Sequence, residues 1–180
     1  MDLARRLLLV GPMGAGKSTV GRHLASLLGW QFVDSDHVIE ERTGADIPWI
    51  FELEGEKGFR DREQQTIADL SAWDAVVLAT GGGAVMREQN RLVMKAAGPV
   101  VYLRATVREQ FRRTGYNDKR PLLMGRNRHG VLQDLMRIRD PLYRDVADLV
   151  VATEGKNARK LAEEVVRTLR ERALLPMDLN

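Results

Sequence analysis

A glycine-rich motif near the amino terminus constrains the fold of this chain more than any other feature. The segment Gly11-Pro-Met-Gly-Ala-Gly16-Lys17-Ser18 matches the P-loop pattern G-x-x-x-x-G-K-[ST]. In such a loop the glycines let backbone amides surround phosphate groups, and the following helix directs its positive dipole end at the same anion. The residues expected to bind the phosphates of a nucleotide are Gly14, Ala15, Gly16, Lys17, Ser18 and Thr19.

The sequence around this motif fits a P-loop. An apolar run at residues 7–10 precedes it, and apolar residues at Val20, Leu24 and Leu27–Leu28 follow with helical spacing. Lys17 is expected to reach the β- and γ-phosphates, and Ser18 to ligate Mg²⁺. A β–α turn that holds a lysine by chance is the alternative, and the full match in this context favours nucleotide binding.

Five apolar runs, at residues 7–10, 31–34, 75–79, 100–103 and 149–152, alternate with helix-like stretches. They lack the apolar–polar alternation of a half-exposed strand, as expected for parallel strands that are buried on both faces. The pattern predicts an α/β fold: a three-layer sandwich around a five-stranded parallel sheet. The length of 180 residues, without repeats or an interdomain linker, predicts a single domain over residues 1–180.

Two stretches interrupt this alternation. Residues 47–73 read as helical, with Gly55 and Gly58 as interruptions, whereas residues 116–130 are polar and basic and read as a mobile loop. Between them, Thr106 and Glu109 have the spacing of a capping box, in which each side chain bonds the other's backbone amide. Trp49 and Phe51 are candidates to line a substrate cavity.

Composition excludes several classes of function. The chain has no cysteine, so it forms neither disulfides nor thiolate metal sites, which favours a cytoplasmic enzyme. The net charge of +3 is spread along the chain without an aromatic-interleaved basic tract, so we expect no nucleic-acid partner. No apolar run reaches the length of a membrane span, and the short run before the P-loop does not read as a signal peptide.

Two aspartates follow the second apolar run, where α/β proteins hold their ligands. In Asp34-Ser35-Asp36 one carboxylate can act on a magnesium ion, a cation that prefers oxygen ligands, and the other can accept a hydrogen bond from a substrate hydroxyl. Capping of a helix amino terminus is the alternative reading, because aspartate and serine both favour that position. The nearby P-loop favours the first reading.

Three consecutive glycines, Gly81, Gly82 and Gly83, follow the third apolar run. Glycine costs chain entropy on folding, so a close approach of the backbone to a ligand is a natural reason for such a triplet. A flexible β–α turn is the alternative.

Taken together, these segments resemble the shikimate kinase family along nearly the whole chain. The segments are GPMGAGKST, FVDSD, GEKGFRDRE, TGGG, KRPLL and RDPLY, and they occur in the order of that family. The resemblance implies a fold like that of nucleoside monophosphate kinases, with a substrate-binding region near residues 35–62 and a lid near 114–130. It also implies the substrates ATP and shikimate, with Mg²⁺ as cofactor.

The resemblance also assigns roles to individual residues. By position, Lys17 and Ser18 bind phosphates and Mg²⁺, Asp34 assists the metal, and Asp36 holds the ring hydroxyls of shikimate. Arg60 and Arg139 are expected to grip the substrate carboxylate, and the triplet Gly81, Gly82 and Gly83 to contact the substrate. Arg120 in the lid is expected to act on the phosphates, and Arg113 to stack on adenine. Lys17, Asp36 and Arg120 are therefore the expected catalytic residues.

The expected reaction is transfer of a phosphoryl group from ATP to the 3-hydroxyl of shikimate, giving ADP and 3-phosphoshikimate for aromatic amino acid (chorismate) biosynthesis. We expect a monomer that has no membrane partner. Two alternatives differ from this reading: a related small-molecule P-loop kinase such as a gluconate kinase, and a non-enzymatic nucleotide-binding regulator.

Overall fold

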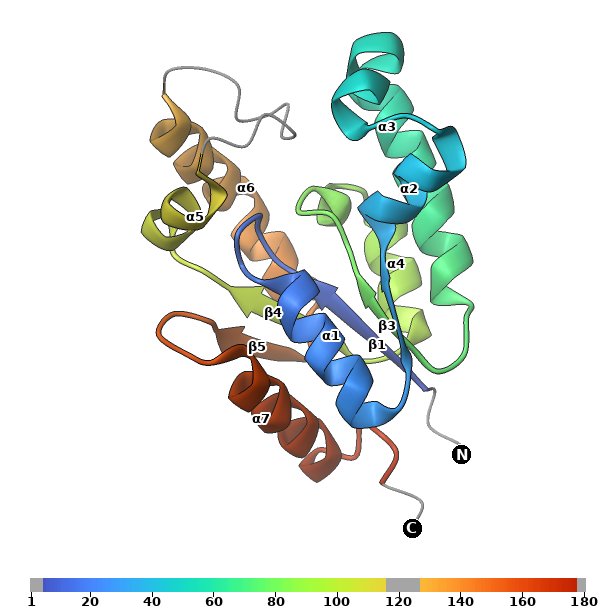
Figure 1. The fold of residues 1–180 in the computed structure, drawn as a ribbon, viewed down its shortest axis with the longest axis vertical. Coiled ribbons are helices and arrows are strands. Elements are labelled where there is room, and N and C mark those ends of the chain that lie inside the picture. The colour runs from blue at the N-terminus through green and yellow to red at the C-terminus, as the bar shows by residue number, and fades with distance from the viewer. Residues whose placement is uncertain (1–4, 116–126, 178–180) are drawn as a thin grey trace.

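The computed structural model describes residues 5–115 and 127–177. It contains a parallel sheet, seven α-helices within these ranges and one short 3₁₀ helix, η1 (Figure 1). In chain order the elements are β1 (Arg6–Val10), α1 (Lys17–Leu28), β2 (Gln31–Asp34), α2 (Ser35–Thr43), α3 (Ile47–Ser71), β3 (Val76–Ala79), η1 (Ala84–Met86), α4 (Glu88–Ala97), β4 (Val100–Arg104), α5 (Val107–Thr114), α6 (Arg128–Val146), β5 (Leu149–Ala152) and α7 (Ala158–Glu171).

The five strands pair in the order β2-β3-β1-β4-β5, and every pair is parallel. The predicted five-stranded parallel sheet is therefore confirmed, and each strand lies within one residue of its predicted bounds. Because β1 and β3 are neighbours in the sheet, the P-loop after β1 and the glycine triplet after β3 leave the sheet side by side. Thr80 fixes this arrangement, since its backbone N–H and its hydroxyl both donate to the Leu9 carbonyl, each at 3.1 Å.

Helices cover both faces of the sheet, and the alternation of side chains along β1 shows how the sequence builds the two layers. Leu7 and Leu9 pack with residues of α1 and α7, whereas Leu8 and Val10 pack with residues of α3, α4 and α6. Figure 1 shows α1 and α7 together on one face. Burial of one leucine side chain contributes roughly 1.5–3 kcal/mol, so these two layers supply most of the stability of the sheet.

The substrate-binding region predicted near residues 35–62 packs as a small unit beside the sheet. Ile39, Ile50 and Phe59 form its own buried cluster, separate from the clusters on the two sheet faces. The helical reading of residues 47–73 is confirmed, with a break at Gly55, whose φ of 70° and ψ of 180° interrupt the helix. Figure 1 shows α2 and the first part of α3 standing apart from α5 and α6 across the carboxyl ends of the strands.

None of the helices in the described parts of the chain combines the length and the apolar character that a membrane span requires.

Candidate active site

The P-loop occupies the turn between β1 and α1, and its conformation depends on glycine. Gly14 and Gly16 have φ angles of 76° and 87°, a region that residues with a β-carbon rarely adopt, and Gly16 is the residue immediately before α1. Nζ of Lys17 folds back over the loop and donates to the carbonyls of Gly11 and Pro12, at 2.7 and 2.9 Å. The lysine charge thus stands at the mouth of the loop, beside the amino terminus of α1.

The carboxylate of Asp34 joins the P-loop to β2. Ser18 Oγ donates to Asp34 Oδ2 at 3.0 Å, and Asp34 Oδ1 accepts from the backbone N–H groups of Asp36 and His37. Asp34 therefore caps α2, as the alternative reading expected, and its other carboxylate oxygen contacts the P-loop serine. A hydroxyl and a carboxylate in contact beside a phosphate loop are oxygen donors of the kind that Mg²⁺ binds.

A cavity of about 440 Å³ opens between the P-loop, α2, α3, the glycine triplet and α6. It brings together most of the predicted site residues from five segments of the chain. Those on its wall are Gly14, Gly16, Lys17, Ser18, Thr19, Asp34, Asp36, Arg60, Gly81, Gly82, Gly83 and Arg139. Its remaining lining residues, for which we predicted no role or only a lining role, are Met13, Glu40, Ile47, Phe51, Phe59, Glu63 and Thr80.

Three of the sequence-based candidates in the described structure do not line the cavity: Ala15, Trp49 and Arg113. Ala15 is buried and packs into the core beneath the P-loop. Phe51 lines the cavity as expected, but the expectation for Trp49 was wrong, since its side chain is 50% exposed and is not among the lining residues. Phe51 and Phe59, with ring centroids 4.8 Å apart, form part of the apolar wall.

Asp36 carries a carboxyl group with a raised pKa in the cavity. Burial raises the pKa of Asp36 to about 7, the negative charges of Asp34 and Glu63 add to the shift, and Lys17 and Arg60 oppose it. Part of Asp36 reaches the cavity surface, but its Oδ1 is shielded and has no hydrogen-bond partner among the described residues. Where it faces the cavity, the Asp36 carboxyl group can accept a hydrogen bond from a ligand hydroxyl.

Arg60 and Arg139 also line the cavity, and both are more than nine-tenths buried. Arg60 Nη1 donates to Glu63 Oε2 at 2.7 Å, and its Nη2 donates to Glu56 Oε1 at 3.5 Å. Arg139 Nε is buried without a hydrogen-bond partner in residues 5–115 and 127–177. Burial raises the pKa of Glu63, and the charges of Arg60 and Arg139 oppose that shift. The two guanidinium groups are donors of the kind that bind a carboxylate.

Sequence reasoning missed the role of Glu63, although the residue lies in the quoted segment GEKGFRDRE. The signal was its spacing of three residues after Arg60, which places both side chains on one helix face. The side chain of Glu63 is fully buried, and its Oε1 lacks a hydrogen-bond partner within the described structure.

The glycine triplet passes through the centre of these charged groups. A β-carbon added at Gly81 would stand 2.8 Å from Asp36 Oδ1 and 2.9 Å from Glu63 Oε1, and one added at Gly83 would overlap the Arg60 guanidinium. Gly81 and Gly83 therefore allow charged side chains to pack closely against the backbone. The alternative of a merely flexible turn does not account for these contacts.

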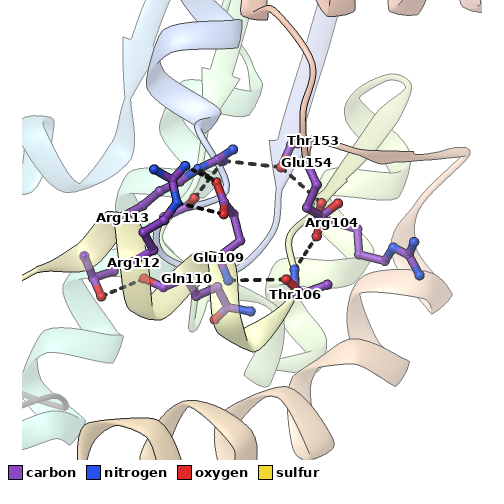
Figure 2. Close-up of polar contacts among 10 residues, drawn as sticks. Arg104, Thr106, Glu109, Gln110, Arg112, Arg113, Thr153 and Glu154 are labelled. Atoms are coloured by element: carbon purple, nitrogen blue, oxygen red, sulfur yellow. Dashed lines mark hydrogen bonds and ion pairs between the residues drawn. The ribbon is translucent and has the colours of Figure 1, made fainter.

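Arg113 lies on α5, outside the cavity, and contacts the outer side of the P-loop (Figure 2). Its Nε donates to Glu109 Oε1 at 2.6 Å, and its Nη1 donates to the Gly14 carbonyl and to Thr153 Oγ1, at 3.1 and 3.4 Å. Arg113 thereby connects the P-loop to the loop after β5.

The predicted capping box is only half formed. Thr106 Oγ1 accepts from the Glu109 backbone N–H, but the Thr106 backbone N–H donates to Glu154 Oε1 at 2.5 Å instead of to Glu109 (Figure 2). The carboxylate of Glu109 instead accepts hydrogen bonds from two arginines, Arg112 and Arg113, because charged donors bind a carboxylate more strongly than a backbone amide does. Arg120 and most of the predicted lid lie outside the described residues.

A parallel α/β sheet with a P-loop, next to a cavity that holds a carboxylate and two buried arginines, defines a P-loop kinase that acts on a small anionic molecule. A family model described as shikimate kinase matches residues 13–170. The chain belongs to the shikimate kinase family.

Individual relatives agree with the family model. The shikimate kinase of Pseudomonas fluorescens (strain Pf0-1) is 58% identical over 165 residues, which cover 92% of this chain and 96% of that protein. The structure of shikimate kinase from Acinetobacter baumannii in complex with shikimate has 52% identity and a TM-score of 0.93, and the match covers 96% of each chain. A gluconokinase from Sinorhizobium meliloti 1021 has a TM-score of 0.57 at 14% identity over 96% of this chain and 95% of that one, which is a likeness of fold alone.

Proposed function

We propose that this enzyme transfers the γ-phosphoryl group of ATP to the 3-hydroxyl of shikimate, giving 3-phosphoshikimate and ADP on the route to chorismate. One observation supports this assignment above the others. A single cavity holds the P-loop, an unpaired carboxylate oxygen of Asp36 and two buried arginines. Shikimate carries one carboxylate and three hydroxyls, so its chemistry complements that arrangement.

The substrate carboxylate binds to Arg60 and Arg139 in this proposal. Each guanidinium offers a planar pair of donors that matches a carboxylate. Glu63 and Glu56 already accept hydrogen bonds from Arg60, so the substrate carboxylate shares that guanidinium with them. Arg139 lines the same cavity and supplies the second guanidinium.

The substrate hydroxyls bind to Asp36, which orients the attacking oxygen toward the P-loop. Phosphoryl transfer needs positioning and charge stabilisation more than it needs a strong base. With a pKa of about 7, Asp36 is ionised in a large fraction of molecules at neutral pH and can accept the hydroxyl proton or its hydrogen bond.

The phosphate groups bind to the P-loop residues from Gly14 to Thr19, with Lys17 on the β- and γ-phosphates. Ser18 and Asp34 would hold Mg²⁺, which usually takes one or two protein oxygens together with phosphate and water. When bound, the metal neutralises phosphate charge. In this proposal Arg113 on α5, which contacts the P-loop at Gly14, stacks on the adenine base, and Arg120 acts on the transferring phosphoryl group.

The domain boundaries, the monomeric state and the cytoplasmic location remain proposals. We propose a single domain over residues 1–180, with the lid at 114–130, that acts as a monomer in the cytoplasm without nucleic-acid or membrane partners. Size-exclusion chromatography with light scattering tests the monomer, which should elute near the chain mass of 20.3 kDa.

A coupled assay of ADP release tests the reaction. Purified protein with ATP and Mg²⁺ should release ADP with shikimate and release little with gluconate, while Lys17→Ala should remove turnover and leave the circular dichroism spectrum intact. Turnover with gluconate but not with shikimate would assign the chain to the other kinase activity. No phosphorylated product with either acid would favour a nucleotide-binding regulator.

A further inference from the structure

The glycine triplet owes its position to one side chain that no step of the proposed reaction uses. The carbonyls of Gly81 and Gly83 accept backbone bonds from Ala84 and Met86 in the following turn, at 3.1 and 3.0 Å. The carbonyl of Gly82 instead accepts a hydrogen bond from the hydroxyl of Tyr143 at 2.5 Å. The middle residue of the triplet is therefore held by α6, an element far away in sequence.

Tyr143 is fully buried and lies one helical turn after Arg139, so both side chains project from the same face of α6. Gly82 lies next to that face as well: a β-carbon added there would stand 3.5 Å from Arg139 Nη1. The Arg139 guanidinium also interacts with the Tyr143 hydroxyl, although burial dominates and raises the pKa of that tyrosine. The hydroxyl thus remains a neutral donor at any working pH.

We propose that Tyr143 is a positioning residue that holds the glycine triplet against Arg139 and thereby sets the geometry of the substrate carboxylate site. This inference rests on the proposed function, because the carboxylate site is the one assigned to shikimate. Glycines have few conformational restraints, so a triplet without an anchor would sample positions in which its backbone no longer faces the arginines. The Tyr143 hydroxyl reduces that freedom before substrate arrives.

The fold supplies a matched control for this hydroxyl. Tyr102 on β4 is also fully buried and stacks on Tyr143, with ring centroids 4.8 Å apart. Its hydroxyl, however, donates to Asp140 Oδ1 at 2.8 Å, away from the cavity lining. Tyr143→Phe and Tyr102→Phe therefore each remove one buried hydroxyl from the same stacked pair, and only the first loosens the triplet.

Steady-state kinetics of the two variants test the proposal. Tyr143→Phe should raise the KM for shikimate about 5- to 20-fold, the size expected for loss of one buried hydrogen bond, while the KM for ATP stays within about twofold. Tyr102→Phe should leave both KM values within about twofold of the wild-type values, even if its melting temperature falls as far as that of Tyr143→Phe. Equal shikimate KM values in the two variants would overturn the proposal.

Two features keep this test decisive. If wild-type protein does not phosphorylate shikimate, the proposed function fails, whereas normal wild-type turnover with an unaffected Tyr143→Phe refutes only the role of Tyr143.

If Tyr143→Phe does not fold, wild-type protein carrying 3-fluorotyrosine gives a second readout by fluorine NMR. Single Tyr→Phe variants at positions 102 and 116 assign the signals. Shikimate should shift the Tyr143 resonance and leave that of Tyr102 in place. An unmoved Tyr143 signal would contradict the proposal.

Discussion

At the level of single residues, the carboxyl of Asp36 lies among charges of both signs. Burial and the neighbouring carboxylates raise its pKa to about 7, so a large fraction of the free enzyme carries a proton there at neutral pH. A protonated carboxyl cannot accept the hydroxyl proton of the substrate. In the proposed mechanism, the ionised fraction of Asp36 therefore limits the reaction on the acidic side.

The pH dependence of kcat/KM for shikimate tests this role, because with ATP saturating that ratio reports ionisations of the enzyme–ATP complex to which shikimate binds. It should rise about tenfold per pH unit well below pH 7 and level off above pH 8. Measurements from pH 5 to 9 at fixed ionic strength, with ATP saturating, give the profile. A flat profile between pH 5.5 and 8 would show that Asp36 ionisation does not matter for the step.

The same shift predicts an effect on stability, with a definite sign. Between about pH 4 and pH 7 the folded protein retains a proton on Asp36 that the unfolded chain has released, so the free energy of unfolding falls as pH rises through that window. Asp36→Asn removes this pH-dependent loss of stability, because an amide does not titrate. At pH 8 the variant should be more stable than wild type by about 1–3 kcal/mol, and the advantage should shrink toward pH 5.

Urea unfolding of both proteins at pH 5 and pH 8 measures this difference. The variant should also lose at least about a hundredfold in kcat/KM, since an amide cannot take the hydroxyl proton. A variant that is less stable than wild type at both pH values would count against the raised pKa.

Arg139 provides a test of the carboxylate site. Arg139→Ala should raise the KM for shikimate by about tenfold or more and leave the KM for ATP nearly unchanged, because a buried charge-assisted contact is lost. Arg137→Ala on the same helix is the control, since its side chain is 78% exposed and should change neither value. Unchanged shikimate affinity in Arg139→Ala would place the substrate carboxylate elsewhere.

At the level of elements, α5 acts as a brace on the outer side of the P-loop. Its residue Arg113 is held by Glu109 and reaches the Gly14 carbonyl, while Glu154 binds the amino-terminal end of the same helix (Figure 2). Hydrogen bonds from the arginines, that of Arg112 foremost, lower the pKa of Glu109 to about 2, so its charge persists throughout the working range of pH. The brace connects the phosphate loop with the loop after β5.

Glu109→Gln should weaken this brace and raise the KM for ATP about threefold to tenfold, with the KM for shikimate within twofold. The effect should be the same from pH 6 to pH 9, because Glu109 does not titrate there. Glu163→Gln is a matched control, since Glu163 forms a similar ion pair with Arg159 on the exposed face of α7. An ATP KM equal in the two variants would mean that Glu109 does not position Arg113.

Much of this architecture could be predicted from the sequence, because apolar runs and the P-loop depend on local patterns. The strands of a parallel sheet are buried on both faces and appear as continuous apolar runs, so all five were found. The segments that form the site could also be named. What could not be predicted was how groups from different elements pair, such as Glu154 with Thr106 or Tyr143 with Gly82.

These pairings depend on distances between segments that lie 48 and 61 residues apart, about which local spacing carries no information. The wrong expectation for Trp49 has a related cause. Residues 49 and 51 are both apolar, but the helix turns only one of them toward the cavity, and two neighbouring phenylalanines already fill the apolar wall.

At the level of the whole molecule, groups suited to binding phosphate and groups suited to binding an acid meet at the carboxyl ends of the strands. The carboxyl ends of β1 and β2 supply the P-loop and its acidic partner, and β3 supplies the glycine triplet. The arginines come from α3 and α6. The P-loop and the groups proposed to bind the acidic acceptor therefore line one cavity, as direct phosphoryl transfer requires.

A crystal structure of the enzyme with shikimate and a non-hydrolysable ATP analogue tests this arrangement most directly. The shikimate carboxylate should lie within hydrogen-bonding distance of both Arg60 and Arg139, and a ring hydroxyl should contact Asp36 while facing the terminal phosphate group. A shikimate bound outside this cavity, or with its carboxylate turned toward the P-loop, would contradict the account.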